Sequence, residues 1–232
     1  MVSIEGSIAL VTGGQRGLGE AFVQELLDRG AAKVYASART PTPVADPRVV
    51  PVALDVTDQA SVAALARIAD DVMIVVNNAG VGGAGPLLTA DVADIKEVFE
   101  TNLFGAIRVA QTFAPILAGN GGGALVDIHS ALSWIAVGAS KAAFWSATNS
   151  LRLELAAQGT LVVGVHLGYA DTDMTSTVTA PKLDPRVVAG AVVDGIADDR
   201  TEVLVDDTSR HFKQAVAGPV EGLAVTGRAS TN

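Results

Sequence analysis

The sequence of 232 residues contains no cysteine, and its three histidines, His129, His166 and His211, are scattered along the chain. The absence of cysteine excludes disulfide bonds, thiolate catalysis and zinc sites built on cysteine. Three histidines without a shared spacing give no ligand pattern for a metal ion. We therefore expect a protein with no metal site.

Basic residues are also few, since 16 Lys and Arg stand against 25 Asp and Glu, for a formal net charge of -9. No basic stripe can follow a phosphate backbone, which disfavours nucleic acid as a partner. No apolar run reaches the ~20 residues that span a membrane, and residues 1–6 are neither basic nor long and apolar. We expect a cytoplasmic protein without a membrane partner.

Short apolar runs alternate with amphipathic stretches of helical length, which is typical of parallel strands joined by helical crossovers. This pattern predicts a single-domain α/β fold of Rossmann type, a doubly wound parallel sheet of about seven strands with helices on both faces. We expect strands at residues 8–11, 33–37, 49–54, 72–76, 124–128, 161–166 and 202–205. We expect helices at residues 18–29, 59–68, 92–117, 139–157, 185–196 and 207–217.

The predicted domain covers residues 1–217, and no linker rich in proline, serine or charge divides it. Residues 173–190 are expected to form a lid over the substrate. Residues 218–232 are small and polar enough to form a flexible C-terminal tail.

A glycine-rich turn, Thr12-Gly13-Gly14-Gln15-Arg16-Gly17-Leu18-Gly19, connects the first predicted strand to the first helix. Glycine lets the backbone approach a ligand closely, and a helix N-terminus offers free N–H groups to a diphosphate. The spacing Gly-x-x-x-Gly-x-Gly therefore predicts a nucleotide site, with a glycine turn that binds no ligand as the simpler alternative.

Polar residues follow two further strands of the predicted sheet. Asp55 follows the third strand and can accept a hydrogen bond from an adenine amino group, while Asn78-Ala79-Gly80 follows the fourth. The structural alternatives are that Asp55 is a turn residue and that Asn78 holds neighbouring strands together. In combination with the glycine turn, these residues favour a ligand site at the carboxyl edge of the sheet.

From Ser7 to about Ala217 the chain resembles the classical short-chain dehydrogenase/reductase family. The resemblance is carried in family order by Thr12-Gly13-x-x-x-Gly17-x-Gly19, Asp55, Asn78-Ala79-Gly80, Asn102, Ser130, Ser140-Lys141, and Gly168 with Thr172. It implies a nicotinamide-dependent oxidoreductase acting on a carbonyl or alcohol substrate. It also implies a homodimer or homotetramer that assembles through the helices at 92–117 and after Lys141.

The coenzyme-binding residues expected from the motifs and the resemblance share one edge of the sheet. They are Gly13, Gln15, Arg16, Gly17, Leu18, Gly19, Ser37, Arg39, Asp55, Val56, Asn78, Ala79, Gly80, Lys141, Gly168 and Thr172.

The charge at the end of the second predicted strand favours NADP(H) over NAD(H). An acidic residue there would bind the ribose hydroxyls of NAD(H), whereas a 2′-phosphate requires a cation. The strand ends Tyr35-Ala36-Ser37-Ala38-Arg39, with no acid. We expect Arg39, Ser37 and Arg16 to contact the phosphate, unless both arginines are only solvated surface charges.

Catalysis in this family uses a tyrosine as proton donor or acceptor, with a lysine four residues later, a serine that orients the substrate and an asparagine that supports a water relay. The resemblance assigns three of these roles to Ser130, Lys141 and Asn102. A phenol is a workable acid or base only where a neighbouring ammonium stabilises its phenolate.

The sequence departs from the family at the tyrosine, because Val137 stands four residues before Lys141. The eleven positions from Ser130 to Lys141 are roughly six fewer than in the family pattern. Either a segment after Val137 is omitted from the sequence, or the deletion is real and the chain is a catalytically inactive dinucleotide-binding sensor or scaffold. We favour omission, because the other three catalytic residues are retained.

Two other titratable residues near this edge have simpler roles. Tyr169 is expected to line the substrate pocket, since the sequence places no lysine beside it. His129 precedes Ser130 on a strand, so it is expected to face the other way and to pack or anchor a loop.

The residues expected to line the pocket are mostly apolar: Val81, Leu132, Trp134, Tyr169 and Met174. They favour a neutral, moderately hydrophobic ketone, aldehyde or secondary alcohol. A methyltransferase on a similar sheet is disfavoured by Asn78-Ala79-Gly80 together with Ser140-Lys141.

Overall fold

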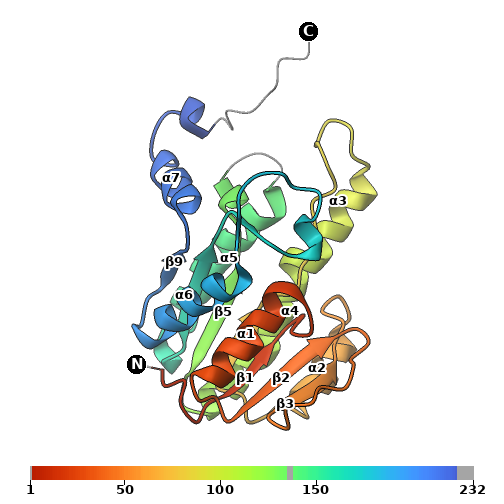
Figure 1. The fold of residues 1–232 in the computed structure, drawn as a ribbon, viewed down its shortest axis with the longest axis vertical. Helices are drawn as coiled ribbons and strands as arrows, with labels where there is room; N and C mark the ends of the chain where they lie inside the picture. Colours follow the sequence, from red (N-terminus) through yellow and green to blue (C-terminus); the bar gives the residue numbers. More distant parts are fainter. Residues whose placement is uncertain (1, 135–137, 224–232) are drawn as a thin grey trace.

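The computed structural model describes residues 2–134 and 138–223, in which seven parallel strands form one central sheet (Figure 1). The strand order is β3-β2-β1-β4-β5-β6-β9. The strands are β1 (Ile8–Val11), β2 (Lys33–Ala38), β3 (Val49–Ala53), β4 (Ile74–Asn77), β5 (Ala124–Ile128), β6 (Leu161–His166) and β9 (Glu202–Leu204). This order confirms the predicted doubly wound sheet of Rossmann type.

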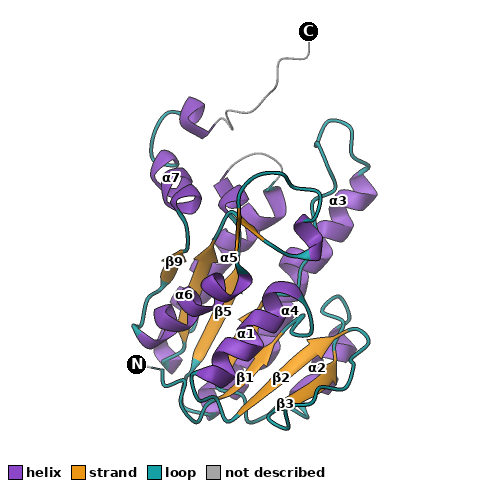
Figure 2. Cartoon of the chain, viewed as in Figure 1, coloured by secondary structure: helices purple, strands orange, loops and turns teal. Residues whose placement is uncertain are grey.

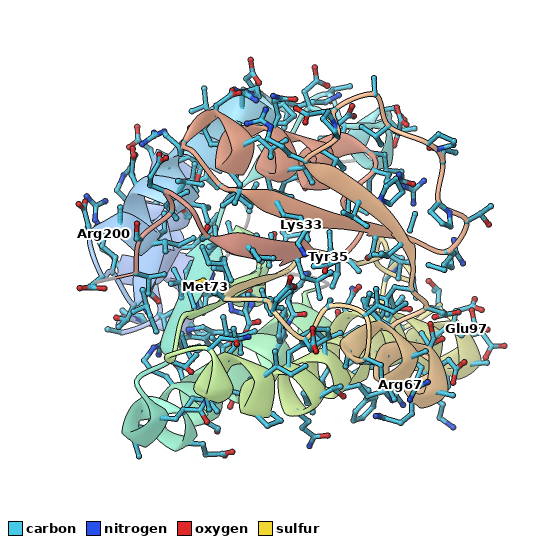
Figure 3. All side chains as sticks on the ribbon, turned by 90° about the horizontal axis from the view of Figure 1, so that it is seen from below. Lys33, Tyr35, Arg67, Met73, Glu97 and Arg200 are labelled. Carbon is cyan, nitrogen blue, oxygen red and sulfur yellow. The ribbon has the colours of Figure 1, made fainter. Side chains whose placement is uncertain are left out.

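Helices cover both faces of the sheet, as Figures 2 and 3 show. The helices α1 (Gly17–Asp28) and α6 (Pro185–Ala197) pack on one face and against each other. The helices α2 (Gln59–Ala66), α4 (Ala106–Gly119) and α5 (Ala139–Glu154) lie on the other. Figure 1 shows α3 (Val92–Phe99) and α7 (Asp207–Ala215) beyond the same end of the sheet.

Alternate strand residues supply the two cores. In β1, Ala9 and Val11 pack with α1 and α6, whereas Leu10 between them packs with α2 and α4. Both faces are therefore buried, which is why the strands read as continuous apolar runs and not as alternating patterns.

The predicted helix at 92–117 is divided. A π-helical segment, Glu100–Gly105, separates α3 from α4. Gly105 lies against Val56, and a Cβ at Gly105 would stand 2.7 Å from the Val56 Cγ2. Such wide turns are rare and frequently occur at functional sites, and this one contains Asn102.

The predicted lid is shorter than residues 173–190. A short helical turn, Asp173–Thr175, and the two-stranded sheet of β7 (Tyr169–Ala170) and β8 (Lys182–Leu183) lie in this region. From Pro185 onward the chain forms α6, in which Val188 and Ala189 are fully buried. A core helix cannot open, so a movable segment would end at Asp184, whose side chain caps α6.

The C-terminal tail predicted at 218–232 begins with a short 3-10 turn, Val220–Leu223. The rest of that prediction, residues 224–232, and Val137 with its neighbours Ile135 and Ala136 lie outside the described residues.

The core on the α4 face depends on Phe113, a fully buried side chain of α4. We expect Phe113→Ala to lower the free energy of unfolding by about 3–5 kcal/mol, because the close-packed surroundings cannot fill the cavity. Urea unfolding measures the loss. The matched control is Val187→Ala on the exposed side of α6, where the change should stay within about 0.5 kcal/mol; equal losses in both variants would contradict this assignment of the core.

Candidate active site

The predicted site residues lie at the carboxyl edge of the sheet, around the ends of the paired strands β1 and β4. Strand order reverses there, because β2 and β3 continue on one side and β5, β6 and β9 on the other. In open α/β sheets such a reversal point is where ligands bind.

The glycine turn after β1 depends on the absence of side chains. Gly13 and Gly17 have φ of 65° and 53°, in the left-handed region that favours glycine. A Cβ at Gly19 would lie 2.0 Å from the Gly13 carbonyl oxygen and 2.7 Å from the Asn78 Nδ2. The turn thus packs backbone against backbone and leaves its outer surface for a ligand.

The N-terminus of α1 provides an anion site beside this turn. The helix begins at Gly17, its cap residue Arg16 is extended, and no described side chain caps it. Thr172 stands next to Gly17, with its Cγ2 3.2 Å from the position of a Cβ on Gly17. The Thr172 hydroxyl caps the turn at Asp173–Thr175. Free N–H groups and the helix dipole at the start of α1 fit the diphosphate of a dinucleotide.

Asn78 holds neighbouring strands together, which is the structural role that the sequence left open as an alternative. Its Nδ2 donates to the Thr12 carbonyl oxygen at 2.9 Å, and the backbone N–H groups of Asn78 and Ala79 both donate to the Thr12 Oγ1 at 2.9 Å. These bonds join the turn after β4 to the turn after β1. Asn78 therefore holds in place the turn that is predicted to bind the coenzyme.

The cationic end of β2 lies beside the glycine turn. The Ser37 hydroxyl is buried and accepts the Gly13 N–H at 3.2 Å, so in this structure it holds the turn. Arg16 and Arg39 are exposed. The side-chain amide of Gln15 pairs with the backbone of Thr42.

Asp55 forms a turn and remains available to a ligand. Its Oδ1 accepts from the Thr57 N–H and hydroxyl, at 2.9 and 2.7 Å. These bonds, and secondarily the guanidinium of Arg39, lower the pKa of the Asp55 carboxyl. An ionised Asp55 beside Arg39 can accept from an adenine amino group. Val56 is buried against Gly105.

Asn102 connects the loop after β4 to α5. Its Oδ1 accepts the Val81 N–H at 2.8 Å, and its Nδ2 donates to the Val81 carbonyl at 3.1 Å and to the Ser140 hydroxyl at 3.3 Å. A Cβ at Gly80 would stand 3.1 Å from the same Oδ1, so Gly80 permits this approach.

Lys141 and Ser130 lie where β5 leads toward α5. The Lys141 Nζ donates to the Ile128 carbonyl at 2.7 Å. Burial lowers the pKa of Lys141 to about 8, against the opposing effect of the Asp127 carboxylate. The Ser130 hydroxyl accepts the Leu132 N–H at 3.1 Å. Within the described ranges, Asn102, Ser130 and Lys141 form no hydrogen bond with one another.

Gly168 is held by α7. Its N–H donates to the Asp206 Oδ2 at 2.9 Å, and a Cβ there would lie 2.7 Å from that oxygen. Asp206 also caps α7. The sequence analysis predicted that Gly168 lets the coenzyme approach, and it missed this carboxylate.

A second residue that the sequence analysis missed is Asp127, which is fully buried in β5. Its two carboxylate oxygens accept from the Asn77 Nδ2 at 3.0 Å and from the Thr148 hydroxyl at 2.7 Å. Asn77 also donates to the Ala106 carbonyl at the start of α4. Burial raises the pKa of Asp127 to about 6. The only sequence signal was an acid within an apolar strand.

Neither tyrosine of the chain hydrogen-bonds to Lys141. The Tyr35 hydroxyl accepts from Lys33 at 2.8 Å and bonds to Asp71, at the opposite edge of the sheet (Figure 3). Tyr169 in β7 is paired in register with Lys182 in β8, a neighbour that the sequence did not reveal. The Lys182 ammonium, however, binds Asp171.

His129 has the packing role that was predicted. Its buried ring meets Phe144 at 4.6 Å between centroids. Trp134, in contrast, was expected to line the pocket, and it is buried instead, stacked on His166 with Lys213 of α7 over its ring. A ring held on both sides in this way presents little surface to a substrate.

A small apolar hollow of about 20 Å³ lies beside Ser140, between α3, the start of α5 and the loop after β4. It is lined by Gly83, Ala84, Gly85, Leu87, Ile95, Val98, Phe99, Ala139 and Ser140.

The part of the chain that the structure describes lacks two features, a membrane-spanning helix and a metal-binding group. None of its helices has the length and apolar character needed to cross a membrane. It also contains no group of His, Cys, Asp and Glu that could hold a metal ion.

Comparison with known proteins gives concordant results. The family model for short chain dehydrogenase matches residues 7–183. The chain is 30% identical to a ketoacyl reductase, HetN, of Nostoc sp., covering 89% of this chain and 80% of that protein. It is 29% identical to the 3-oxoacyl-[acyl-carrier-protein] reductase FabG of Vibrio harveyi, covering 83% of this chain and 90% of the reductase.

Two solved structures bind different coenzymes. A short chain dehydrogenase from Burkholderia cenocepacia in complex with NADP is 36% identical, with a TM-score of 0.90 over 95% of this chain and 97% of that one. A short chain dehydrogenase/reductase from Burkholderia phymatum in complex with NAD is 25% identical, with a TM-score of 0.79 over 94% and 96% of the two chains.

The raised pKa of Asp127 predicts a pH dependence of stability. Because the folded protein binds this proton more tightly than the unfolded chain, the stabilisation is present at acid pH and is lost as the pH rises through about 6. An amide at this position has no proton to lose. We expect Asp127→Asn to gain roughly 1–3 kcal/mol of unfolding free energy relative to wild type between about pH 4 and pH 8.

Urea unfolding across that range measures the difference. Asp70→Asn, at an exposed carboxylate, is the control and should leave the pH dependence unchanged. A variant of Asp127 with the wild-type slope would contradict a buried carboxylate at this position.

Proposed function

The chain belongs to the short chain dehydrogenase family, and we propose that it is an NADP(H)-dependent oxidoreductase. It would transfer a hydride from NADPH to a ketone or aldehyde, or in reverse from a secondary alcohol to NADP. The observation that carries the proposal is the glycine turn and uncapped α1 N-terminus beside the cations Arg16 and Arg39.

The residues at the rim fit a dinucleotide. Gly17, Leu18 and Thr172 would hold the diphosphate, because the first N–H groups of α1 have no side-chain cap and Thr172 stands beside the turn. Asp55 would accept from the adenine, since its carboxyl is ionised at neutral pH.

The preference for NADP(H) is supported by charge. β2 ends at Ala38 without an acid, and the exposed Arg39 follows directly. A guanidinium can bind a 2′-phosphate with two hydrogen bonds, and no carboxylate at this position repels that phosphate. The 36% identical neighbour in complex with NADP supports the same choice.

The chemical step would use Lys141 and Ser130, and the tyrosine of the omitted segment would give its proton to the carbonyl oxygen as the hydride adds to the carbon. When bound, the nicotinamide ring supplies or accepts the hydride. Lys141 has a pKa of about 8 and so carries its charge at neutral pH, where it can bind the ribose and hold a positive charge near the reacting oxygen. Ser130 would orient the carbonyl, and Asn102 would fix the loop at Val81 against α5.

The substrate is proposed to be neutral and moderately hydrophobic. The hollow beside Ser140 is lined mainly by apolar residues of α3 and the loop before it. The names of the relatives as ketoacyl and 3-oxoacyl reductases support a ketone as the reacting group. The exposed Phe104 and Leu153, beside α4 and on α5, support assembly of a homodimer or homotetramer through these helices.

The second candidate is a dinucleotide-binding sensor or scaffold without reductase activity. It is favoured by Val137, since a valine cannot donate a proton, and by the distance of Tyr35 from the site. The intact mass of the protein distinguishes an omitted segment from a true deletion. Turnover distinguishes the two functions.

Coenzyme preference is tested at Arg39. We expect Arg39→Ala to weaken NADPH binding about 10- to 100-fold and NADH binding less than about 3-fold, because only NADPH carries the 2′-phosphate. Fluorescence or calorimetric titration measures both. Arg67→Ala, an exposed arginine remote from the rim (Figure 3), should change neither; tighter binding of NADH than of NADPH by the wild type would overturn the preference.

Activity is tested by NADPH oxidation with a panel of ketones and aldehydes that includes 3-ketoacyl esters. We expect turnover by the wild type and a loss of at least about 100-fold in Lys141→Met, with partial retention in Lys141→Arg, which keeps the charge. NADPH affinity should fall as the pH rises through about 8, where Lys141 loses its proton. Tight NADPH binding without turnover would establish the sensor instead.

A further inference from the structure

We propose that Gln15 is a positioning residue for coenzyme specificity, because its side-chain amide fixes the loop after β2 and so holds Arg39 where a 2′-phosphate would lie. This inference rests on the proposed preference for NADP(H). It changes the role of Gln15, which the sequence predicted to touch the coenzyme directly.

The amide of Gln15 makes a two-bond pairing with the backbone of Thr42. The Gln15 Nε2 donates to the Thr42 carbonyl at 2.7 Å, and the Thr42 N–H donates to the Gln15 Oε1 at 2.8 Å. A primary amide presents its donor and acceptor side by side, as a neighbouring strand would. Thr42 is thus paired as if it lay in a sheet, although no strand runs beside it.

The part of the loop that carries Arg39 has few other ways to become ordered, because the other hydrogen bonds of the loop lie at its C-terminal end, at Asp46 and Arg48. Residues 39–48 contain no helix or strand. Thr42 lies between Pro41 and Pro43, which have no N–H groups, so its own N–H is the sole backbone donor of the three. A residue before proline is also restricted to extended conformations, which presents the Thr42 N–H and carbonyl for pairing.

The other end of the Arg39 segment is attached to the same turn. The Gly13 N–H donates to the Ser37 hydroxyl at 3.2 Å, and the Gly14 N–H donates to the Ser37 carbonyl at 2.8 Å. Arg39 is therefore located between two attachments, at Ser37 and at Thr42. Among the described residues, its guanidinium has no hydrogen bond or ion pair, so it is available to a ligand.

Attachment at both ends matters for affinity. A loop that must become ordered when the phosphate binds loses conformational entropy at that moment, and this loss weakens binding. The Gln15 pairing orders the loop beforehand. Its contribution falls on the 2′-phosphate, because Arg39 is the group that the loop carries.

The test compares dissociation constants for NADP and NAD in three variants. Gln15→Ala removes both hydrogen bonds, and Gln15→Met removes them while keeping a side chain of similar length. Thr42→Ala is the matched control, since both bonds go to the Thr42 backbone. We expect the Gln15 variants to weaken NADP binding roughly tenfold and NAD binding less than about twofold, with Thr42→Ala unchanged.

Hydrogen exchange of residues 39–48 in the coenzyme-free protein gives a second readout. Exchange in this loop should accelerate in both Gln15 variants and stay at the wild-type rate in Thr42→Ala. If the wild type binds both coenzymes equally, the proposed preference and this inference both fail. If the wild type prefers NADP and the Gln15 variants keep the same ratio of affinities, the inference alone is wrong.

Discussion

The hydroxyl of Thr12 links the ends of β1 and β4, where the predicted site lies. It accepts the N–H groups of Asn78 and Ala79 and donates to the Val76 carbonyl, while the Asn78 side chain returns a bond to Thr12. These bonds join β1 to β4 at the point where strand order reverses. The glycine turn packs against these linked residues, since Gly19 lies too close to the Asn78 amide for any side chain at position 19. The predicted diphosphate site therefore depends on the buried Thr12.

Beyond the ends of the strands, side-chain amides replace the missing sheet partners. Asn102 pairs with the N–H and carbonyl of Val81, and Gln15 pairs in the same way with Thr42. Each amide satisfies a backbone donor and acceptor that no strand could reach. The two loops on either side of the proposed coenzyme site are thus fixed from the more rigid elements that carry the amides.

Side-chain hydrogen bonds attach α5 to β5. Thr148 donates to Asp127 and Lys141 donates to the Ile128 carbonyl, so the helix is attached to β5 at two positions along its length. Both bonds involve a buried ionisable group, whose desolvation opposes its charge. The start of the helix presents Ser140 to Asn102.

The sequence alone determined the sheet and predicted a site at its carboxyl edge. Buried parallel strands read as short apolar runs, and a glycine turn before a helix is a local pattern, so both could be read without a structure. The π-helical segment at Asn102, the pairing of Gln15 with Thr42 and the burial of Asp127 could not. Each depends on contacts between residues far apart in the chain, and only the packing of the helices on the sheet decides which side chains those contacts bring together.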